Sequence, residues 1–147
     1  MKYPDLSNNK LTFNITNNWK PPFLLYVLKL SHCHIVGSFP PFLKAQLSLM
    51  TLQLTNNTLI GKIPSWLQSL PKLEKLLLSH NQLEGPIPSQ LYTSTSLKQV
   101  ELQDNNLHGN ILNPIGISIA RFPWELDLSI NKITGPVPVM SPKLENK

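Results

Sequence analysis

The sequence predicts an α/β solenoid, a right-handed superhelix with a parallel β-sheet on its concave face and short 3₁₀, helical or irregular segments on its convex face. Two observations support this prediction. A short apolar segment with one shared pattern recurs six times along the 147 residues, and a Gly-x-apolar-Pro motif follows four of the copies. Because one copy cannot bury its own apolar face, neighbouring copies have to stack.

The recurring segment begins at residues 4, 28, 52, 76, 100 and 126, as in "LQLTNNTLIG" and "LLLSHNQLEG". Its L-x-L-x-x-N/C-x-L pattern is that of the leucine-rich repeat. We predict a single domain over residues 1–147, with about five 24-residue repeats, a partial one and no terminal caps. The sixth position of the copies, at intervals of 24, 24, 24, 24 and 26 residues, is occupied by Asn9, Cys33, Asn57, Asn81, Asn105 and Asn131.

Each repeat contains three predicted elements. A short strand, such as residues 52–54, places two leucines toward the core and the residue between them toward solvent. The Gly-x-apolar-Pro motif predicts an extended, non-helical return path, because proline has no N–H to leave unpaired. The loosely spaced leucines of "WLQSLPKLEKL" at 66–76 predict short helical or 3₁₀ turns. Residues 111–125 have Leu112 at the usual proline position and a two-residue insertion, so we expect an irregular loop there.

The sixth position is expected to point inward, where asparagine pairs backbone groups that would otherwise be buried without partners. Cys33 is the only cysteine, and a thiol fits the same space as a weak donor. Its neighbours His32 and His34 raise the alternative of a metal site. Such a site needs three or four convergent ligands, whereas these histidines should point away and His80 should lie about 10 Å off. We therefore expect a buried structural thiol, no metal and no cofactor.

Several functional classes find no support in the sequence. Motifs of hydrolases, metalloproteases, nucleotide-binding loops and kinases are absent, and Glu125 and Asp127 are more simply read as two solvent-facing residues of one strand. Residues 1–100 contain nine lysines and three acidic residues, and this charge is too dilute for a nucleic-acid site. The run "FLLYVL" is far shorter than a membrane helix, and no signal peptide is visible at residues 1–10.

The outward positions of the concave sheet are the candidate binding site, because a rigid surface can vary there without disturbing the core. A face that serves only solubility is the alternative. Two glycosylation sequons begin at Asn14 and Asn56. The candidate ligand-binding residues are Lys29, His32, Gln53, Thr55, Lys75, His80, Glu101, Asp104, Glu125 and Asp127, and the other outward positions are Ser31, Asn56, Leu77, Ser79, Gln99, Gln103 and Ser129.

The form L-x-x-L-x-L-x-x-N-x-L-x-G-x-I-P resembles the plant-specific leucine-rich repeats of receptor-like kinases, receptor-like proteins and polygalacturonase-inhibiting proteins. The stretch "WKPPFLLYVLKLSHCHIVGSFPPFLKAQLSLMTLQLTNN" at 19–57 resembles a "W-x-PPF-x-L…L-x-SC-x-L-G-x-FP-x-WL-x-x-Q" segment of defence-type plant receptor-like proteins. His32 and Phe42 stand where that segment has serine and tryptophan.

This resemblance implies a non-enzymatic recognition module of a receptor-like ectodomain at the plasma membrane or outside the cell. It implies a role in signalling or defence perception, with a peptide or protein ligand and a co-receptor kinase as partners. The family's signal peptide, cysteine-bearing cap and membrane helix are not found in the sequence, so we expect an internal part of such an ectodomain. The alternatives are a soluble inhibitor of a cell-wall hydrolase and a truncated, non-functional product.

Overall fold

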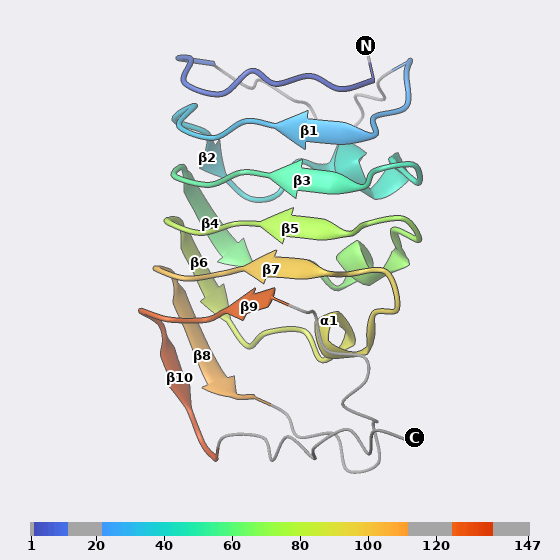
Figure 1. Cartoon of the computed structure of the whole chain (residues 1–147). Coiled ribbons are helices and arrows are strands. Elements are labelled where there is room, and N and C mark those ends of the chain that lie inside the picture. Colours follow the sequence, from blue (N-terminus) through green and yellow to red (C-terminus); the bar gives the residue numbers. More distant parts are fainter. Residues whose placement is uncertain (1, 12–21, 112–124, 137–147) are drawn as a thin grey trace.

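The repeated short strands form one parallel sheet in the computed structural model, which describes residues 2–11, 22–111 and 125–136 (Figure 1). The strand order is β1-β3-β5-β7-β9, so each turn of the chain adds one strand beside the previous one. Leu28 pairs with Leu52, which pairs with Leu76. An isolated bridge between Asp5 and Lys29 extends the sheet by one repeat. The strands are β1 (Val27–Lys29), β3 (Thr51–Gln53), β5 (Lys75–Leu77), β7 (Gln99–Glu101) and β9 (Glu125–Asp127).

A second parallel sheet, in the order β10-β8-β6-β4-β2, lies where the sequence predicted only an extended return path. Within its strands a buried residue alternates with exposed ones, as Leu59 does between Thr58 and Ile60. This period of two is a strand signal that the sequence analysis did not use. The strands are β2 (Val36–Gly37), β4 (Thr58–Lys62), β6 (Gln82–Gly85), β8 (Asn106–Asn110) and β10 (Lys132–Thr134).

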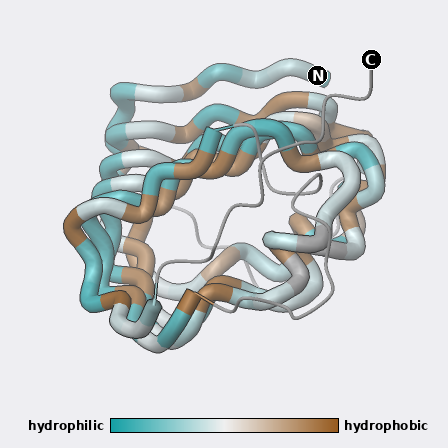
Figure 2. The backbone as a smooth tube through the Cα atoms, turned by 60° about the horizontal axis from the view of Figure 1, so that its bottom comes forward, coloured by the Kyte–Doolittle hydropathy of each residue, from teal (hydrophilic) through white to brown (hydrophobic). Residues whose placement is uncertain are grey.

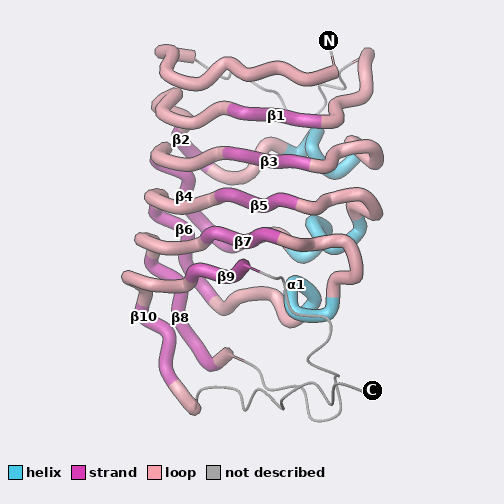
Figure 3. The backbone as a smooth tube through the Cα atoms, in the orientation of Figure 1, coloured by secondary structure: helices cyan, strands magenta, loops and turns pink. Residues whose placement is uncertain are grey.

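Short helical turns complete the coil on the side away from both sheets (Figure 3). They are η1 (Pro41–Ala45), η2 (Ser65–Ser69) and α1 (Gln90–Thr93). Pro40 and Pro64 precede the two 3₁₀ turns with φ angles of −61° and −68°, which the proline ring favours. The predicted short convex segments are therefore confirmed in three repeats.

The core runs through the whole stack as one cluster of apolar side chains. Leu52 and Leu76 from the first sheet, Leu59 from the second and Leu67 from η2 are each at most 1% exposed. Figure 2 shows hydrophobic and hydrophilic residues alternating along the stacked coils. Burial of one such hydrophobic side chain contributes roughly 1.5–3 kcal/mol, so the coils hold each other in place. The predicted solenoid of stacked repeats is thus confirmed, with a second sheet added.

None of the helices in the described ranges is long and apolar enough to span a membrane. The predicted irregular loop at 111–125, with Leu112, falls almost entirely outside the described residues, as does the sequon residue Asn14.

Candidate functional site

The exposed side of the first sheet, which we name the first-sheet face, presents one outward residue between two buried ones on β1, β3, β5 and β7, and Asp127 lies between two half-buried leucines on β9. Lys29, Gln53 and Glu101 lie between such buried neighbours, for example Lys29 between Leu28 and Leu30. Of the ten candidate residues, five are exposed and five are half-buried. The exposed ones are His32, Lys75, His80, Asp104 and Glu125, and the half-buried ones are Lys29, Gln53, Thr55, Glu101 and Asp127.

Two shallow hollows adjoin each other on this face and share Lys75. The second hollow, over β5 to β9, has a volume of about 400 Å³ and is lined by Lys75, Lys98, Gln99 and Glu125. Together they contain Lys29, Gln53, Lys75 and Glu125, which are four of the six candidate residues on the strands β1 to β9. The first hollow, of about 470 Å³, is lined by Tyr3, Asp5, Val27, Lys29, Thr51, Gln53, Lys75 and Leu77.

Two of the three lysines in these hollows are neutralised by the neighbouring repeat. Lys29 Nζ lies 3.6 Å from Asp5 Oδ2, and Lys98 Nζ lies 2.9 Å from Glu74 Oε2. Both pairs are 24 residues apart in sequence, so they connect equivalent positions of adjacent coils. Within the described ranges, Lys75 has no ion-pair partner, because its strand neighbours are Thr51 and Gln99.

The far end of the face is acidic. Glu125 pairs across the strands with Gln99, and Glu101 accepts a hydrogen bond of 2.9 Å from Gln99 Nε2. Asp127 accepts a hydrogen bond of 2.9 Å from the backbone N–H of Ser129, and this bond holds the pKa of the carboxyl group below its ordinary value. Asp127 therefore keeps its negative charge in mildly acidic solution.

A left-handed turn follows each strand of this face. Its first residue has φ between +53° and +61° in every described repeat. Asparagine, aspartate and histidine tolerate this conformation better than other residues, and a β-branched residue is an outlier. One candidate pair lies here, with His80 Nδ1 2.7 Å from Asp104 Oδ2. The residues are Asn8, His32, Asn56, His80, Asp104 and Ile130.

The inward asparagine that directly follows the left-handed residue connects consecutive coils. Asn81 Nδ2 donates to the carbonyls of Leu54 and Leu78, each at 3.0 Å, and Asn81 Oδ1 accepts from the backbone N–H of Leu59 at 3.1 Å. Asn57, Asn105 and Asn131 make equivalent bonds. Asn9 at the first coil is exposed and donates to the carbonyls of Leu6 and Ser7. These bonds pair buried backbone groups and have no direct role at the first-sheet face.

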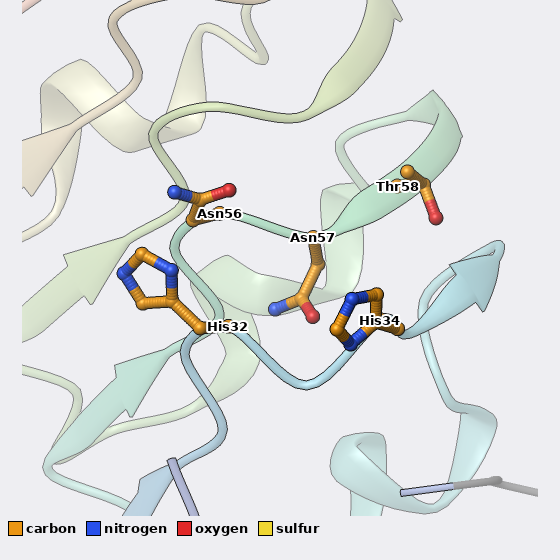
Figure 4. A pocket seen from close by; sticks show the side chains of 5 residues that line it. All are labelled: His32, His34, Asn56, Asn57 and Thr58. Atoms are coloured by element: carbon orange, nitrogen blue, oxygen red, sulfur yellow. The ribbon is translucent and has the colours of Figure 1, made fainter. Parts of the chain in front are cut away.

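Cys33 is fully buried in this row, and its thiol donates to the carbonyls of Leu6 at 3.2 Å and Ser31 at 3.3 Å. His32 and His34 are both exposed and line a small hollow of about 140 Å³ with Asn56, Asn57 and Thr58 (Figure 4). The described residues contain no cluster of three or more metal-ligating side chains.

Two residues that the sequence analysis placed outward are buried. Ser31 is 4% exposed and Ser79 is 2% exposed. Both are short side chains that contact a longer neighbour on an adjacent coil: Ser31 Oγ accepts a hydrogen bond of 2.9 Å from Gln53 of the following coil, and Ser79 Oγ lies 3.4 Å from Thr55 Oγ1 of the preceding coil. The longer residues Thr55 and Gln103 at the equivalent positions are half-buried, so a short side chain at this outward position is covered by its neighbours.

A family model described as leucine rich repeat matches residues 23–83, and solved repeat proteins share the arrangement of the coils. The chain has the leucine-rich repeat fold. It resembles the ectodomain of the Arabidopsis receptor kinase HAESA, solved in complex with an N-terminally extended IDA peptide hormone, with 36% identity and a TM-score of 0.69 over 78% of this chain.

Other leucine-rich repeat structures are similarly close. The BIR2 ectodomain from Arabidopsis thaliana is 34% identical with a TM-score of 0.70, and the match covers 77% of this chain and 58% of that one. A plant ice-binding protein is 36% identical with a TM-score of 0.66, over 78% of this chain and 36% of that one. No curated protein matches the sequence significantly. The leucine-rich repeat chain spans about a fifth of HAESA, of which the match covers 19%.

Sequence reasoning missed the ion pairs of this leucine-rich repeat face. Asp5 with Lys29, Glu74 with Lys98, and His80 with Asp104 are each separated by 24 residues. The repeat period was a sufficient signal, because residues one period apart lie beside each other on adjacent parallel strands.

Proposed function

We propose that the chain is part of a plant receptor ectodomain and that its first-sheet face binds an extended peptide segment. Recognition rather than catalysis is the proposed activity, and residues 1–147 would form part of one longer repeat domain at the cell surface. The observation that carries the proposal is the pair of adjoining hollows from Tyr3 to Glu125, which cross the strands on a rigid face. HAESA, the similar receptor kinase, holds a peptide hormone.

The proposed contacts are made by residues whose side chains are free to vary, because the buried leucines and the inward asparagines hold the coils together. A role in signalling or defence perception, with a co-receptor kinase as a further partner, follows from the same proposal. Asn56 is exposed in the turn after β3 and is the proposed glycosylation position in the described residues. The proposed ligand-binding residues are Lys29, His32, Gln53, Thr55, Lys75, His80, Glu101, Asp104, Glu125 and Asp127.

The test is a selection of random twelve-residue peptides displayed on phage against the immobilised 147-residue chain. Leu77 lies in the first hollow, and we expect Leu77→Arg to reduce binding of the selected peptides at least tenfold, since a long side chain would fill the hollow. Ile60 lies on the second sheet and is 49% exposed, so Ile60→Arg is the matched control that should leave binding unchanged.

Two results would count against the proposal. One is the recovery of no peptide with reproducible affinity. The other is a set of peptides that bind the Leu77→Arg and Ile60→Arg variants equally well, because their site would then lie elsewhere. Circular dichroism of both variants separates loss of binding from loss of folding.

A further inference from the structure

In the hollows of the first-sheet face two of the three lysines form ion pairs, whereas Lys75 and the carboxylates Glu101, Glu125 and Asp127 have no ion-pair partner in the described residues. Lys29 has Asp5 beside it and Lys98 has Glu74. Lys75 and Glu125, in contrast, both pair across the strands with Gln99. In the described residues neither of them has an ion-pair partner within the protein. One cation and one anion are thus left open to a ligand in the same hollow.

We propose that the first-sheet face selects extended peptides that carry one acidic and one basic side chain about three residues apart. This inference rests on the proposed function. The acidic side chain lies at Lys75, and the basic side chain lies at Glu125 with Asp127 nearby. Asp127 supports the basic side because the hydrogen bond from Ser129 keeps its carboxylate charged.

The spacing follows from the geometry of the sheet. Lys75 is on β5 and Glu125 is on β9, with β7 between them. Two steps of about 4.8 Å between neighbouring strands separate the two positions by roughly 10 Å. A peptide in the extended polyproline II conformation advances about 3.1 Å per residue and completes one turn in three residues, so side chains three residues apart lie on the same side and about 9 Å apart. Peptides with both charges adjacent, or with two charges of one sign, match only one of the two positions.

The order of the open charges also excludes a purely acidic or purely basic ligand. A polyacidic peptide meets Lys75 but then passes Glu101, Glu125 and Asp127, and like charges in proximity repel. A polybasic peptide is attracted by these carboxylates but meets Lys75 and Lys98 in the same hollow. A bipolar peptide satisfies both ends, and its affinity falls with rising salt because the charges are exposed.

The experiment uses the peptides selected above, measured against Lys75→Gln and Glu125→Gln. Each substitution should weaken a bipolar peptide roughly three- to fivefold, the effect of one exposed ion pair. Replacing the acid of the peptide by its amide should cause the same loss and should abolish the effect of Lys75→Gln, since the two changes remove one contact. Lys62→Gln and Glu84→Gln, both on exposed positions of the second sheet, are the matched controls.

The outcomes separate this inference from the proposed function. Peptides that lose affinity on Leu77→Arg but lack an acid–base pair, or that respond equally to Lys75→Gln and Lys62→Gln, overturn the inference and leave the peptide site in place. Peptides insensitive to Leu77→Arg overturn both. Enrichment of acid–base pairs three residues apart, with coupling between Lys75 and the peptide acid, is the expected result.

Discussion

The turns at Cys33 and Asn81 occupy the same place in two coils, but they pair the backbone differently. Asn81 donates to three carbonyls, those of Leu54, Leu78 and Ser79, and it accepts from the N–H of Leu59. Cys33 donates through its thiol to two carbonyls. A thiol is a weak donor and a poor acceptor, so it performs only the donor half of the asparagine's role.

The backbone after these two turns differs as well. After Asn81, Gln82 enters β6, whereas after Cys33 the next residue, His34, has a left-handed φ of 55° and β2 contains only two residues. Asn57 of the following coil compensates, because its Oδ1 accepts from the N–H groups of both Cys33 and Ile35. The row of inward asparagines therefore tolerates one weak member, because the asparagine of the following coil accepts hydrogen bonds from two N–H groups around it.

The largest expected effect is that of Asn81→Leu. It leaves the buried N–H of Leu59 unpaired, which costs about 1–3 kcal/mol. It also removes one of the two donors from each of the carbonyls of Leu54, Leu78 and Ser79, where each lost hydrogen bond costs about 0.5–1.5 kcal/mol. We expect the free energy of unfolding to fall by roughly 3 kcal/mol or more. Urea unfolding followed by circular dichroism measures it, with the neighbouring exposed position in Gln82→Leu as control. A loss no greater than that of the control would show that the inward asparagines do not contribute substantially to stability.

A smaller effect is expected at Cys33. Cys33→Leu should lower the free energy of unfolding by about 1–3 kcal/mol, because leucine crowds the fully buried site and removes the thiol donor from the carbonyls of Leu6 and Ser31. In the described residues these carbonyls then keep only their bonds from Asn9 and from the N–H of Asn8. Cys33→Asn should be tolerated, since the other coils accommodate asparagine at this position. The same urea titration compares both variants with the parent chain. If Cys33→Asn proves as damaging as Cys33→Leu, the two turns are not interchangeable.

The smallest expected effect is a gain at Ile130. This residue has φ of 53° and is 72% exposed, so it bears the cost of a left-handed conformation without contributing to the core. That conformation costs roughly 1–2 kcal/mol for an ordinary residue and less for asparagine. Ile130→Asn should therefore stabilise the chain by about 1 kcal/mol. The thermal midpoint of unfolding measures this gain, and Ile60→Asn on β4 is the control. An equal rise in the midpoint of the control would show that the gain comes only from replacing an exposed apolar residue.

Much of the fold could be predicted because the repeat period converts sequence distance into spatial proximity. Leu28, Leu52 and Leu76 had to stack once the 24-residue spacing was recognised, and the short convex turns followed from the loosely spaced leucines. The second sheet was missed because four of its five strands contain a glycine, a residue typical of turns, so that they resemble loops. Its signal was the buried Leu59 between two exposed residues.

The candidate site was predictable only as a set of outward positions. Lys29 and Lys75 are both lysines on outward strand positions, yet Asp5 neutralises one while Gln99 and Thr51 flank the other. The period alone indicates which residues are neighbours. It does not indicate whether the side chains reach each other, and Ser31 and Ser79 show that a residue at an outward position can be covered by a side chain of an adjacent coil.

The sequence by itself determined the stacking of the coils and the inward row of asparagines. Both depend on a local pattern that every repeat contains, so each coil folds in the same way. Only the tertiary structure decided which charges remain open and where the hollows lie. These properties depend on side-chain length and on the residue one coil away, and Lys75 and Glu125 differ from the paired charges solely in the neighbours that the stack brings to them.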